Sequence, residues 1–433
     1  MNIETKLELL RNKMKTENID LLYVTTADEH CSEYIPEDCK EREYISGFTG
    51  SNGDFIITEN EAILWTDGRY FLQADEELSG TEIKLYKMGI PGFPKVMEYI
   101  VGKYNEYLEK TETPGGNDSD ISAASESSKV SGNSESSGKS PENTAFTVAF
   151  NSKLVPAEFL WTLKQNLNKT GNNFNIVNSN LISDLWAKDK DNPKPDSYAF
   201  PAYEFETKYC GEPRSEKLGR VRTEMKKVGA SHHIISSLDD INWLLNIRGC
   251  DIKHNPVVQS FVIMSEDSCK LFINPGCIND DLKFQLSIDN IEIYPYDEFY
   301  SYLRNITSAD RATLDNKSSE TVPDNNDYPN SAPDEKNSSE SVPDEENSSE
   351  SAPDEKNSSE SAPEKNNALE TAPVENNQHF FETSDSTNNS EKVTRILLDM
   401  KNVNAEILNS IIDKKLIFNS PNPEVLMKAV KNE

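Results

Sequence analysis

The 433-residue sequence is poor in apolar side chains and in positive charge. Its hydrophobic content of 35% is low for a globular protein, which predicts that part of the chain lies outside any packed core. Lys and Arg number 44 against 75 Asp and Glu, so the net charge is −31 and no basic tract stands out. This balance argues against nucleic acid as a partner, because the phosphates would be repelled.

Long hydrophobic runs and secretory cysteine patterns are also missing. The N-terminal stretch MNIETKLELLRNKMKTENIDLLYV has no signal-peptide core, and no window approaches the length of a membrane span. The six cysteines show no C-x-x-C spacing, and we expect them to be reduced. We therefore expect a cytoplasmic protein without a membrane partner.

The motifs of common catalytic sites are absent as well. The sequence contains no G-x-S-x-G, no Walker loop and no H-E-x-x-H. The stretch SGFTGSNG (46–53) does not run from a strand into a helix, so we interpret it as a tight turn and not as a phosphate loop. From the residues alone, the chain shows no active site.

The five histidines do not form a metal-binding pattern. His232 and His233 are neighbours on an apolar strand, so they point to opposite faces and cannot bind one metal together. His30 lies in ADEHCSEYIPEDC, where the spacing of Cys, His and Asp fits no standard zinc site. His254 precedes an Asn-Pro turn and is expected to cap or fix a loop, while His379 falls in a low-complexity segment.

Two low-complexity segments interrupt the chain. Residues 113–143 lack apolar periodicity, and residues 316–391 repeat proline every ten residues in units such as SAPDEKNSSE. The second segment carries 19 acidic and 4 basic side chains, and it has almost no large apolar residue to bury in a solenoid. We predict that both are disordered inserts acting as solvated spacers. Because KVTRILLDM follows the acidic repeat with a new apolar pattern, that insert interrupts a domain.

An internal duplication organises the rest of the sequence. Residues 7–30 align without gaps with residues 218–241, and apolar residues recur in both copies at the spacing of a helix with one buried face. In each copy a short apolar strand follows, LLYV or HHII, and the alignment also matches Arg11 with Arg222. Hairpins are predicted in GDFIITENEAILWTD and QSFVIMSEDSCKLFINP. We therefore predict an α/β fold of two homologous domains, 1–197 and 198–433.

The stretch ILWTDGRYFLQADEELSG (63–80) places one arginine, Arg69, at the corner between a strand and an acidic helix. Taken by itself, this arginine is explained by an ion pair with a nearby acid such as Asp75 or Glu76. A guanidinium also offers a planar fork of donors suited to carbonyl or carboxylate oxygens of a ligand. The turn at 66–68 would direct the side chain, and Thr66 or Asp67 could cap the helix.

Three long motifs resemble one known family, in the right order. SEYIPEDCKEREYISGFTGSNGDFIITENEAILWTDGRYFLQA (32–74) resembles the first domain of the eukaryotic Xaa-Pro aminopeptidases (aminopeptidase P), of the creatinase/prolidase "pita-bread" family. SLDDINWLLNIRGCDIKHNPVVQSFVIM (237–264) resembles their second domain, and LMKAVKNE (426–433) the start of the helix leading into their third. The resemblance implies two creatinase N-terminal-type domains, each a mixed sheet flanked by helices.

The resemblance also implies a chemistry. The family hydrolyses the bond between a first residue and the proline after it, with two Mn²⁺ ions held by the third domain. Because Glu433 stands where that domain would begin, we expect the catalytic pita-bread domain to be absent, with no catalytic residue, metal ligand or cofactor in this chain. Arg69 matches the arginine of the family motif W-T-D-G-R, which reaches toward the bound peptide, so we predict a substrate-binding role for it.

Three interpretations of function stay open, and with them the question of whether the protein is an enzyme. The chain is the non-catalytic N-terminal region of an Xaa-Pro aminopeptidase, a stand-alone peptide-binding or regulatory pseudo-peptidase module, or part of a full metalloaminopeptidase whose catalytic domain is missing from the gene model. Expected partners are Xaa-Pro peptides and a catalytic pita-bread domain or a full-length relative. We expect a monomer, since the dimer interface of the family lies largely in the third domain, and an exposed apolar patch where that domain would dock.

Overall fold

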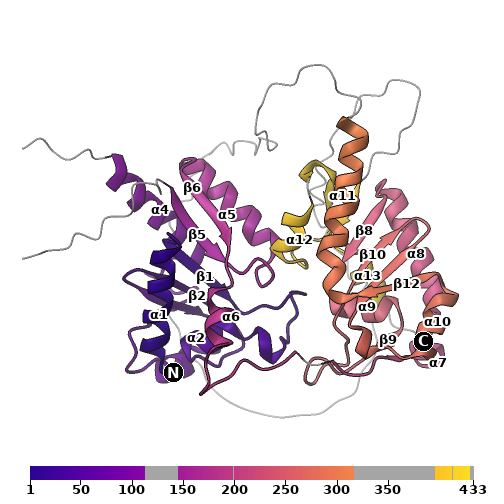
Figure 1. The fold of residues 1–433 in the computed structure, drawn as a ribbon, viewed down its shortest axis with the longest axis horizontal. Coiled ribbons are helices and arrows are strands. Elements are labelled where there is room, and N and C mark those ends of the chain that lie inside the picture. Colours follow the sequence, from indigo (N-terminus) through magenta and orange to yellow (C-terminus); the bar gives the residue numbers. More distant parts are fainter. Residues whose placement is uncertain (113–144, 198, 316–394, 412, 430–433) are drawn as a thin grey trace, which may run out of the picture. The chain divides into compact units, whose positions relative to one another are not determined.

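The computed structural model describes residues 1–112, 145–197, 199–315, 395–411 and 413–429. These residues belong to one compact unit. The inserts predicted at 113–143 and 316–391, together with His379, lie outside the described residues. Two six-stranded mixed sheets, each flanked by helices, make up the described part of the chain (Figure 1), which confirms the predicted α/β class.

The first sheet uses strands from residues 21 to 178, in the order β4-β3-β2-β1-β5-β6. Its strands are β1 Leu21–Thr25, β2 Asp54–Thr58, β3 Ala62–Thr66, β4 Lys84–Lys87, β5 Phe146–Phe150 and β6 Phe174–Asn178. Its helices are α1 Ile3–Thr16, α2 Glu41–Ser46, α3 Phe71–Glu77, α4 Val96–Glu112, α5 Ala157–Thr170 and α6 Leu181–Trp186, with a 3-10 turn at Glu37–Cys39.

The second sheet has the order β12-β11-β10-β8-β13-β14, and a short pair, β7-β9, lies apart from it. The strands are β7 Tyr203–Glu204, β8 His232–Ile235, β9 Ile247–Arg248, β10 Ser260–Ser265, β11 Cys269–Ile273, β12 Ile291–Pro295, β13 Ile396–Leu398 and β14 Ile417–Asn419. The helices are α7 Thr207–Cys210, α8 Arg214–Lys227, α9 Leu238–Leu244, α10 Asp280–Ile288, α11 Phe299–Asp315, α12 Ala405–Ser410 and α13 Pro423–Ala429. Three 3-10 turns lie at Pro275–Cys277, Tyr296–Glu298 and Lys414–Leu416.

The two sheets repeat one topology, as the duplication predicted. β1 pairs antiparallel with β2 and parallel with β5, and β8 pairs antiparallel with β10 and parallel with β13. The helices α1 and α8 are separated by the same offset of 211 residues at both ends. Both predicted hairpins form, as β2-β3 and β10-β11. The boundary between 197 and 198 stays a prediction.

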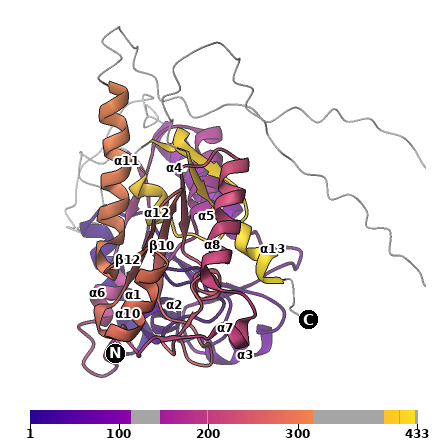
Figure 2. The ribbon, with the colours of Figure 1, turned by 90° about the vertical axis from the view of Figure 1, so that its right-hand side faces the viewer.

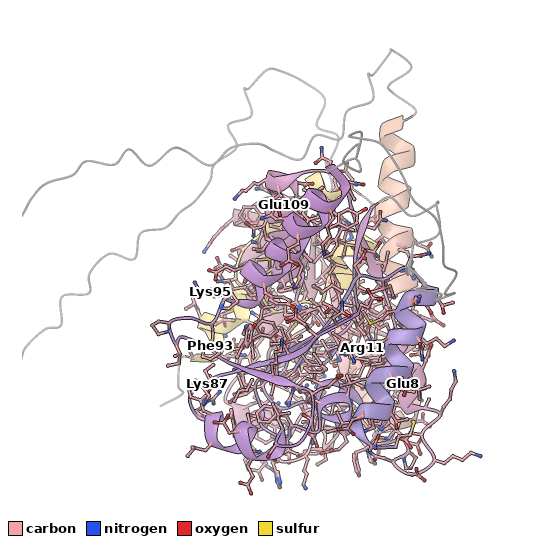
Figure 3. All side chains as sticks on the ribbon, turned by 90° about the vertical axis from the view of Figure 1, so that its left-hand side faces the viewer. Glu8, Arg11, Lys87, Phe93, Lys95 and Glu109 are labelled. Atoms are coloured by element: carbon pink, nitrogen blue, oxygen red, sulfur yellow. The ribbon has the colours of Figure 1, made fainter. Side chains whose placement is uncertain are left out.

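Matched residues of the duplication make equivalent contacts. Arg11, on α1 (Figure 3), donates from Nε to the carbonyl of Thr58 at 3.0 Å, where β2 ends. Arg222 donates from Nε to the carbonyl of Ser265 at 3.2 Å, where β10 ends. In both domains an arginine of the first helix therefore satisfies the last carbonyl of the neighbouring antiparallel strand, which stabilises the helix against the sheet.

The apolar faces predicted for the first helices form the cores. Leu7, Leu10 and Met14 of α1 are at most 2% exposed, and Leu218, Val221 and Met225 of α8 are buried to the same extent. On α4, Ile100 and Tyr104 are fully buried, and Phe93, which lies before the helix, is 37% exposed (Figure 3). Burial of such faces is the main term that holds helices to sheets, at about 25 cal/mol per Å² of apolar surface.

The helix α13 completes the second domain. It follows β14 as α6 follows β6, and it packs on α8 and α9 as α6 packs on α1 and α2. Figure 2 shows α13 beside α8. Two polar pairs hold it: the fully buried Glu424 Oε2 lies 3.2 Å from His233 Nε2, and the partly exposed Lys428 Nζ lies 2.6 Å from the buried Asp240 Oδ1. The residues expected to begin a helix toward a third domain, as far as they are described, therefore belong to a helix packed within the second domain.

No helix among the described residues is both long enough and apolar enough to cross a membrane.

Candidate functional site

Arg69 lies on the turn between β3 and α3. The backbone N–H of Tyr70 donates to the carbonyl of Asp67 at 3.0 Å and closes this turn. Thr66, the last residue of β3, donates from Oγ1 to the carbonyl of Asn52 at 2.6 Å. The corner is therefore fastened to the loop that precedes β2, and its backbone direction is fixed from both sides.

The guanidinium of Arg69 pairs side-on with the carboxylate of Asp67. Nε lies 2.9 Å from Oδ1 and Nη2 lies 2.8 Å from Oδ2, while the backbone N–H of Arg69 donates to Oδ1 at 3.0 Å. Asn52 Nδ2 donates to Oδ2 at 2.7 Å. The hydrogen bonds from Arg69, with that from Asn52, hold the pKa of Asp67 well below its usual range, so the pair stays ionised.

This pairing corrects two expectations for the corner. Arg69 pairs with Asp67 and not with Asp75 or Glu76, and Asp75 instead pairs with Lys87 Nζ at 2.9 Å. Neither Thr66 nor Asp67 caps α3, because the N-cap position is Tyr70, and no side chain caps it. Arg69 thus forms an ion pair with a nearby acid, as expected, but the acid is Asp67 and not one of the two acids named from the sequence.

The pairing leaves one edge of the guanidinium unused. Asp67 occupies Nε and one N–H of Nη2, so both N–H groups of Nη1 and the second N–H of Nη2 face outward. The Arg69 side chain is 67% exposed, and its guanidinium lies 5.2 Å from the centre of the Tyr70 ring. A planar oxygen acceptor of a ligand can therefore approach this edge without displacing Asp67.

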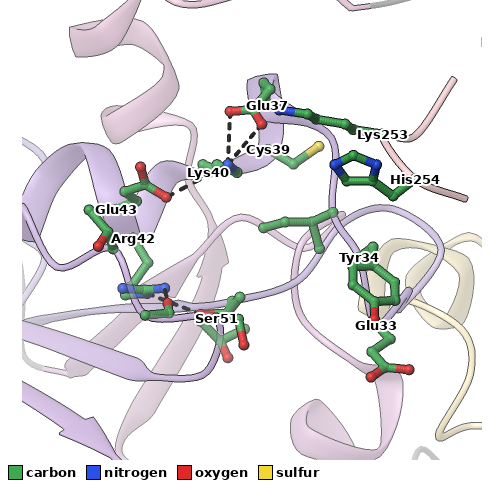
Figure 4. Close-up of a pocket in the computed structure, with 15 residues that line it drawn as sticks. Glu33, Tyr34, Glu37, Cys39, Lys40, Arg42, Glu43, Ser51, Lys253 and His254 are labelled. Carbon is green, nitrogen blue, oxygen red and sulfur yellow. Dashed lines mark hydrogen bonds and ion pairs between the residues drawn. The ribbon is translucent and has the colours of Figure 1, made fainter. Parts of the chain in front are cut away.

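A cavity of about 300 Å³ opens next to the corner (Figure 4). Ser51 lines it, and Ser51 Oγ lies 2.6 Å from the Tyr70 hydroxyl, directly after Arg69 in the chain. The cavity is lined by Thr25, Thr26, Glu33, Tyr34, Ile35, Glu37, Cys39, Lys40, Arg42, Glu43, Thr49, Gly50, Ser51, Lys253 and His254. Most of these residues come from the segment between β1 and β2, and two come from the loop before β10.

Arg42 organises the loop at the base of the cavity. Its guanidinium, 4% exposed, donates to the carbonyls of Phe48 and Gly50, and its Nε donates to Thr26 Oγ1 at 3.0 Å. Burial lowers the pKa of Arg42 to about 10. A Cβ atom at Gly50 would lie 2.2 Å from Phe48 Cζ, so the loop requires glycine there. The stretch 46–53 is thus a compact connection between α2 and β2, as expected, and not a phosphate loop.

The charged residues of the cavity are partly paired. Lys40 Nζ lies 2.8 Å from Glu37 and 3.9 Å from Glu43. Glu33 and Lys253 form no ion pair within the described part of the chain, and they carry opposite charges. The cavity therefore offers both signs of charge, together with the rings of Tyr34 and His254, to a ligand that has polar groups of both kinds.

His30 is buried in the protein and serves a structural role. It is 2% exposed, with Nδ1 2.9 Å from the carbonyl of Ser236 and Nε2 2.9 Å from the Tyr296 hydroxyl. The ring also lies 4.4 Å from the ring of Phe261. No group of three or more His, Cys, Asp or Glu residues in the described ranges is arranged to hold a metal ion.

The other described histidines lie apart from one another, in a strand and in a loop. His232 is partly exposed, while its neighbour His233 is fully buried, with Nδ1 3.2 Å from the carbonyl of Leu397. His254 is exposed and has φ of +66°, in a loop where Ile252 and Asn255 form an isolated bridge. His254 therefore takes the left-handed position of this loop, and its ring lines the cavity.

The sequence singles out Arg69, whose role stays a prediction, and gives no direct indication of the cavity. Its walls come from residues 25–51 and 253–254, which are far apart in sequence, and neither segment carries a catalytic motif. One signal pointed to it: the loop after α2 and the loop after α9 occupy equivalent places in the duplicated fold. The pairing of Asp67 with Arg69 was also missed, because a partner two residues away requires the turn itself.

The sequence and the fold of this chain are similar to those of known proteins. The model of the creatinase/prolidase N-terminal domain matches residues 6–126, and a second model of the same description matches residues 192–360. The X-prolyl aminopeptidase of Caenorhabditis elegans, described as a cytosolic enzyme with a di-nuclear active site, has a similar fold, with a TM-score of 0.67 and 20% identity. The likeness covers 100% of this chain and 52% of that one. The chain therefore contains two creatinase/prolidase N-terminal domains.

Relatives with higher identity narrow the family. Xaa-Pro aminopeptidase 1 of Dictyostelium discoideum is 34% identical over 306 residues, which are 70% of this chain and 42% of that protein. Aminopeptidase P2 of Arabidopsis thaliana is 32% identical over 280 residues, which are 64% of this chain and 33% of that protein. The chain belongs to the Xaa-Pro aminopeptidase P family. It spans less than half the length of these two relatives.

Proposed function

We propose that this chain is the non-catalytic, peptide-binding N-terminal region of an Xaa-Pro aminopeptidase. In this proposal, Arg69 donates hydrogen bonds to an oxygen of an Xaa-Pro peptide, and the adjacent cavity receives part of that peptide. Hydrolysis is the work of a catalytic pita-bread domain, either in the same protein or in a full-length relative. The names of the relatives support the substrate class, since they are Xaa-Pro aminopeptidases.

One observation carries the proposal: the free edge of the Arg69 guanidinium. Asp67 accepts hydrogen bonds from the Arg69 side chain and a further one from Asn52 Nδ2, at 2.7 Å. The carboxylate is therefore held from two sides, and it fixes the position of the guanidinium. The guanidinium is 67% exposed and held at two atoms, so it loses little freedom when a ligand binds. Such a preorganised donor suits recognition better than stability, because exposed ion pairs contribute about 0–1 kcal/mol.

Calorimetric titration tests this proposal. Ala-Pro-Ala is titrated into the full chain and into Arg69→Ala, and we expect the substitution to weaken binding by about tenfold, from the loss of a charged donor. Arg220→Ala is the matched control, because Arg220 is also exposed and paired, with Nη2 2.7 Å from Glu212. Equal affinity of the wild-type chain and Arg69→Ala would refute a role for Arg69 in binding.

The alternative to this proposal is a regulatory module that acts on its own. As a stand-alone regulatory module, it would bind peptides or a full-length relative without any catalytic domain of its own. Co-purification of the tagged chain from its own cells tests the regulatory module: a catalytic relative recovered with it supports a docking role, and a partner-free monomer that binds no proline-containing peptide in calorimetry would rule the module out. We propose the cytoplasm as the compartment, with neither nucleic acid nor membrane as a partner.

A further inference from the structure

Arg69 is proposed above to bind a peptide oxygen, and the kind of oxygen that it selects depends on the charges around it. Asp67 cancels the charge of the guanidinium at close range, since the two groups are joined at 2.8 and 2.9 Å. Asp67 accepts four hydrogen bonds, two from the Arg69 side chain, one from its backbone and one from Asn52. The outward edge of Arg69 therefore presents N–H donors without a net positive charge behind them.

The surroundings do not restore a positive potential. Glu33, on the lining of the cavity, acts on Arg69 as an opposite charge and has no ion-pair partner among the described residues. Lys253 and the buried Arg42 also line the cavity, and Lys40 lies 2.8 Å from Glu37 and 3.9 Å from Glu43. The nearby carboxylate of Glu77 accepts from Thr49 N and Oγ1, at 2.9 and 2.6 Å, and from Gln73. Around this corner the charges therefore sum to no excess of positive charge.

This arrangement distinguishes between two possible ligand oxygens. A terminal carboxylate at the free edge would lie across the guanidinium from Asp67, so the repulsion by Asp67 acts at a longer range and offsets part of the Coulomb attraction to Arg69. A backbone carbonyl carries no net charge and needs only directed donors, which the edge supplies. The carbonyl keeps its hydrogen bonds at this site, whereas the carboxylate loses part of the attraction that usually makes arginine its partner.

This inference rests on the function proposed above. We propose that Asp67 is a specificity-determining residue that makes Arg69 select a neutral backbone carbonyl of a peptide over a terminal carboxylate. Asn52 is a positioning residue, since its side chain donates to Asp67 and its backbone carbonyl accepts from Thr66 Oγ1. The ligand class is then peptide that continues past the corner, or whose end carries no charge. Free-acid peptides that end at the corner are excluded from the preferred class.

A comparison of two peptides across four forms of the full chain tests this assignment. Ala-Pro-Ala and its C-terminal amide are titrated into wild type, Asp67→Asn, Asn52→Ala and Arg69→Ala at low ionic strength. Wild type is expected to bind the amide at least as tightly as the acid. Asp67→Asn leaves Arg69 as an uncompensated cation and is expected to bind the acid about fivefold more tightly than the amide. Asn52→Ala keeps both charges, so it weakens both peptides by a similar factor and leaves their ratio unchanged.

The outcomes separate this inference from the proposed function. If Arg69→Ala weakens binding but Asp67→Asn leaves the ratio of acid to amide affinity as in wild type, the selectivity is wrong and peptide binding stands. If Arg69→Ala binds like wild type, both fail. Salt titration of wild type adds a test that needs no variant: affinity for the acid is expected to change less than twofold between low and physiological ionic strength. A steep fall of that affinity with salt would overturn the neutral-carbonyl assignment.

Discussion

Acid titration of His30 offers the sharpest test of how the protein is held together. The imidazole is 2% exposed, and burial lowers its pKa to about 4. Nδ1 lies 2.9 Å from the carbonyl of Ser236 and Nε2 lies 2.9 Å from the Tyr296 hydroxyl, which also lies 3.4 Å from Glu29 Oε2, so both nitrogens of the neutral ring have partners. Protonation would place a charge in this buried position, and the nearby charge of Glu29 offsets only part of the cost of burial.

The sign and size of the effect follow from linkage. The folded pKa lies below the unfolded value of about 6.5, so protons bind preferentially to the unfolded chain. The stability due to neutral His30 is complete above pH 6.5 and is lost as the pH falls toward about 4. The difference between the pKa of about 6.5 in the unfolded chain and about 4 in the folded protein corresponds to about 3 kcal/mol of unfolding free energy. Most of this free energy is lost by about pH 4.5.

His30→Gln removes this titration and keeps an amide that can donate and accept. We expect the variant to be less stable than wild type by about 1–2 kcal/mol near neutral pH, from lost packing against Phe261. Near pH 4.5 the order reverses or the difference vanishes, because only wild type loses stability to His30. Urea unfolding followed by tryptophan fluorescence at the two pH values measures this. His254→Asn, which removes an exposed imidazole, is the control. Equal pH dependence of wild type and His30→Gln would refute the reasoning.

Three further predictions concern the loop, the last helix and catalysis. Gly50→Ala is expected to lower stability by about 1–3 kcal/mol, because the new Cβ would lie 2.2 Å from Phe48 Cζ; an unchanged thermal midpoint would contradict this. Glu424→Gln is expected to destabilise the protein by about 3 kcal/mol near pH 6 and by less near pH 9. Burial opposes a charge on His233, but Glu424 outweighs it and raises the pKa of His233 in the folded protein. The pair therefore stabilises the protein below the pKa that His233 has in the unfolded chain, and this stabilisation is lost as the pH rises through the folded pKa. A destabilisation by Glu424→Gln that does not depend on pH would contradict this. Purified chain with Mn²⁺ is expected to release no alanine from Ala-Pro-Ala, and chelator-sensitive turnover would contradict that.

The fold could be predicted well from the sequence because burial leaves a periodic record. The i, i+3, i+7 pattern at Leu7, Leu10 and Met14, repeated at a fixed offset, marked both first helices and so the duplicated sheets. The hairpins were also readable, since polar residues separate two apolar strands in each. Such patterns depend only on neighbours in the chain, and they survive without knowledge of tertiary contacts.

The candidate site was less predictable because its contacts are not periodic. Asp67 was available to Arg69 from the start, but only the closed turn brings its carboxylate under the guanidinium side-on. His30 found its partners more than 200 residues away, at Ser236 and Tyr296, and no local pattern announces such pairs. The buried pair of His233 and Glu424 is similar: it explains why a histidine stands in a central strand where the first domain has Leu22.

The most direct test of the account is a crystal structure of the chain with Ala-Pro-Ala amide bound. If Arg69 binds a peptide carbonyl while Asp67 holds it, a backbone carbonyl oxygen of the peptide will lie within about 3 Å of Arg69 Nη1 or Nη2, with the ion pair to Asp67 intact. A peptide bound elsewhere, or one whose binding displaces Asp67 from Arg69, would contradict it.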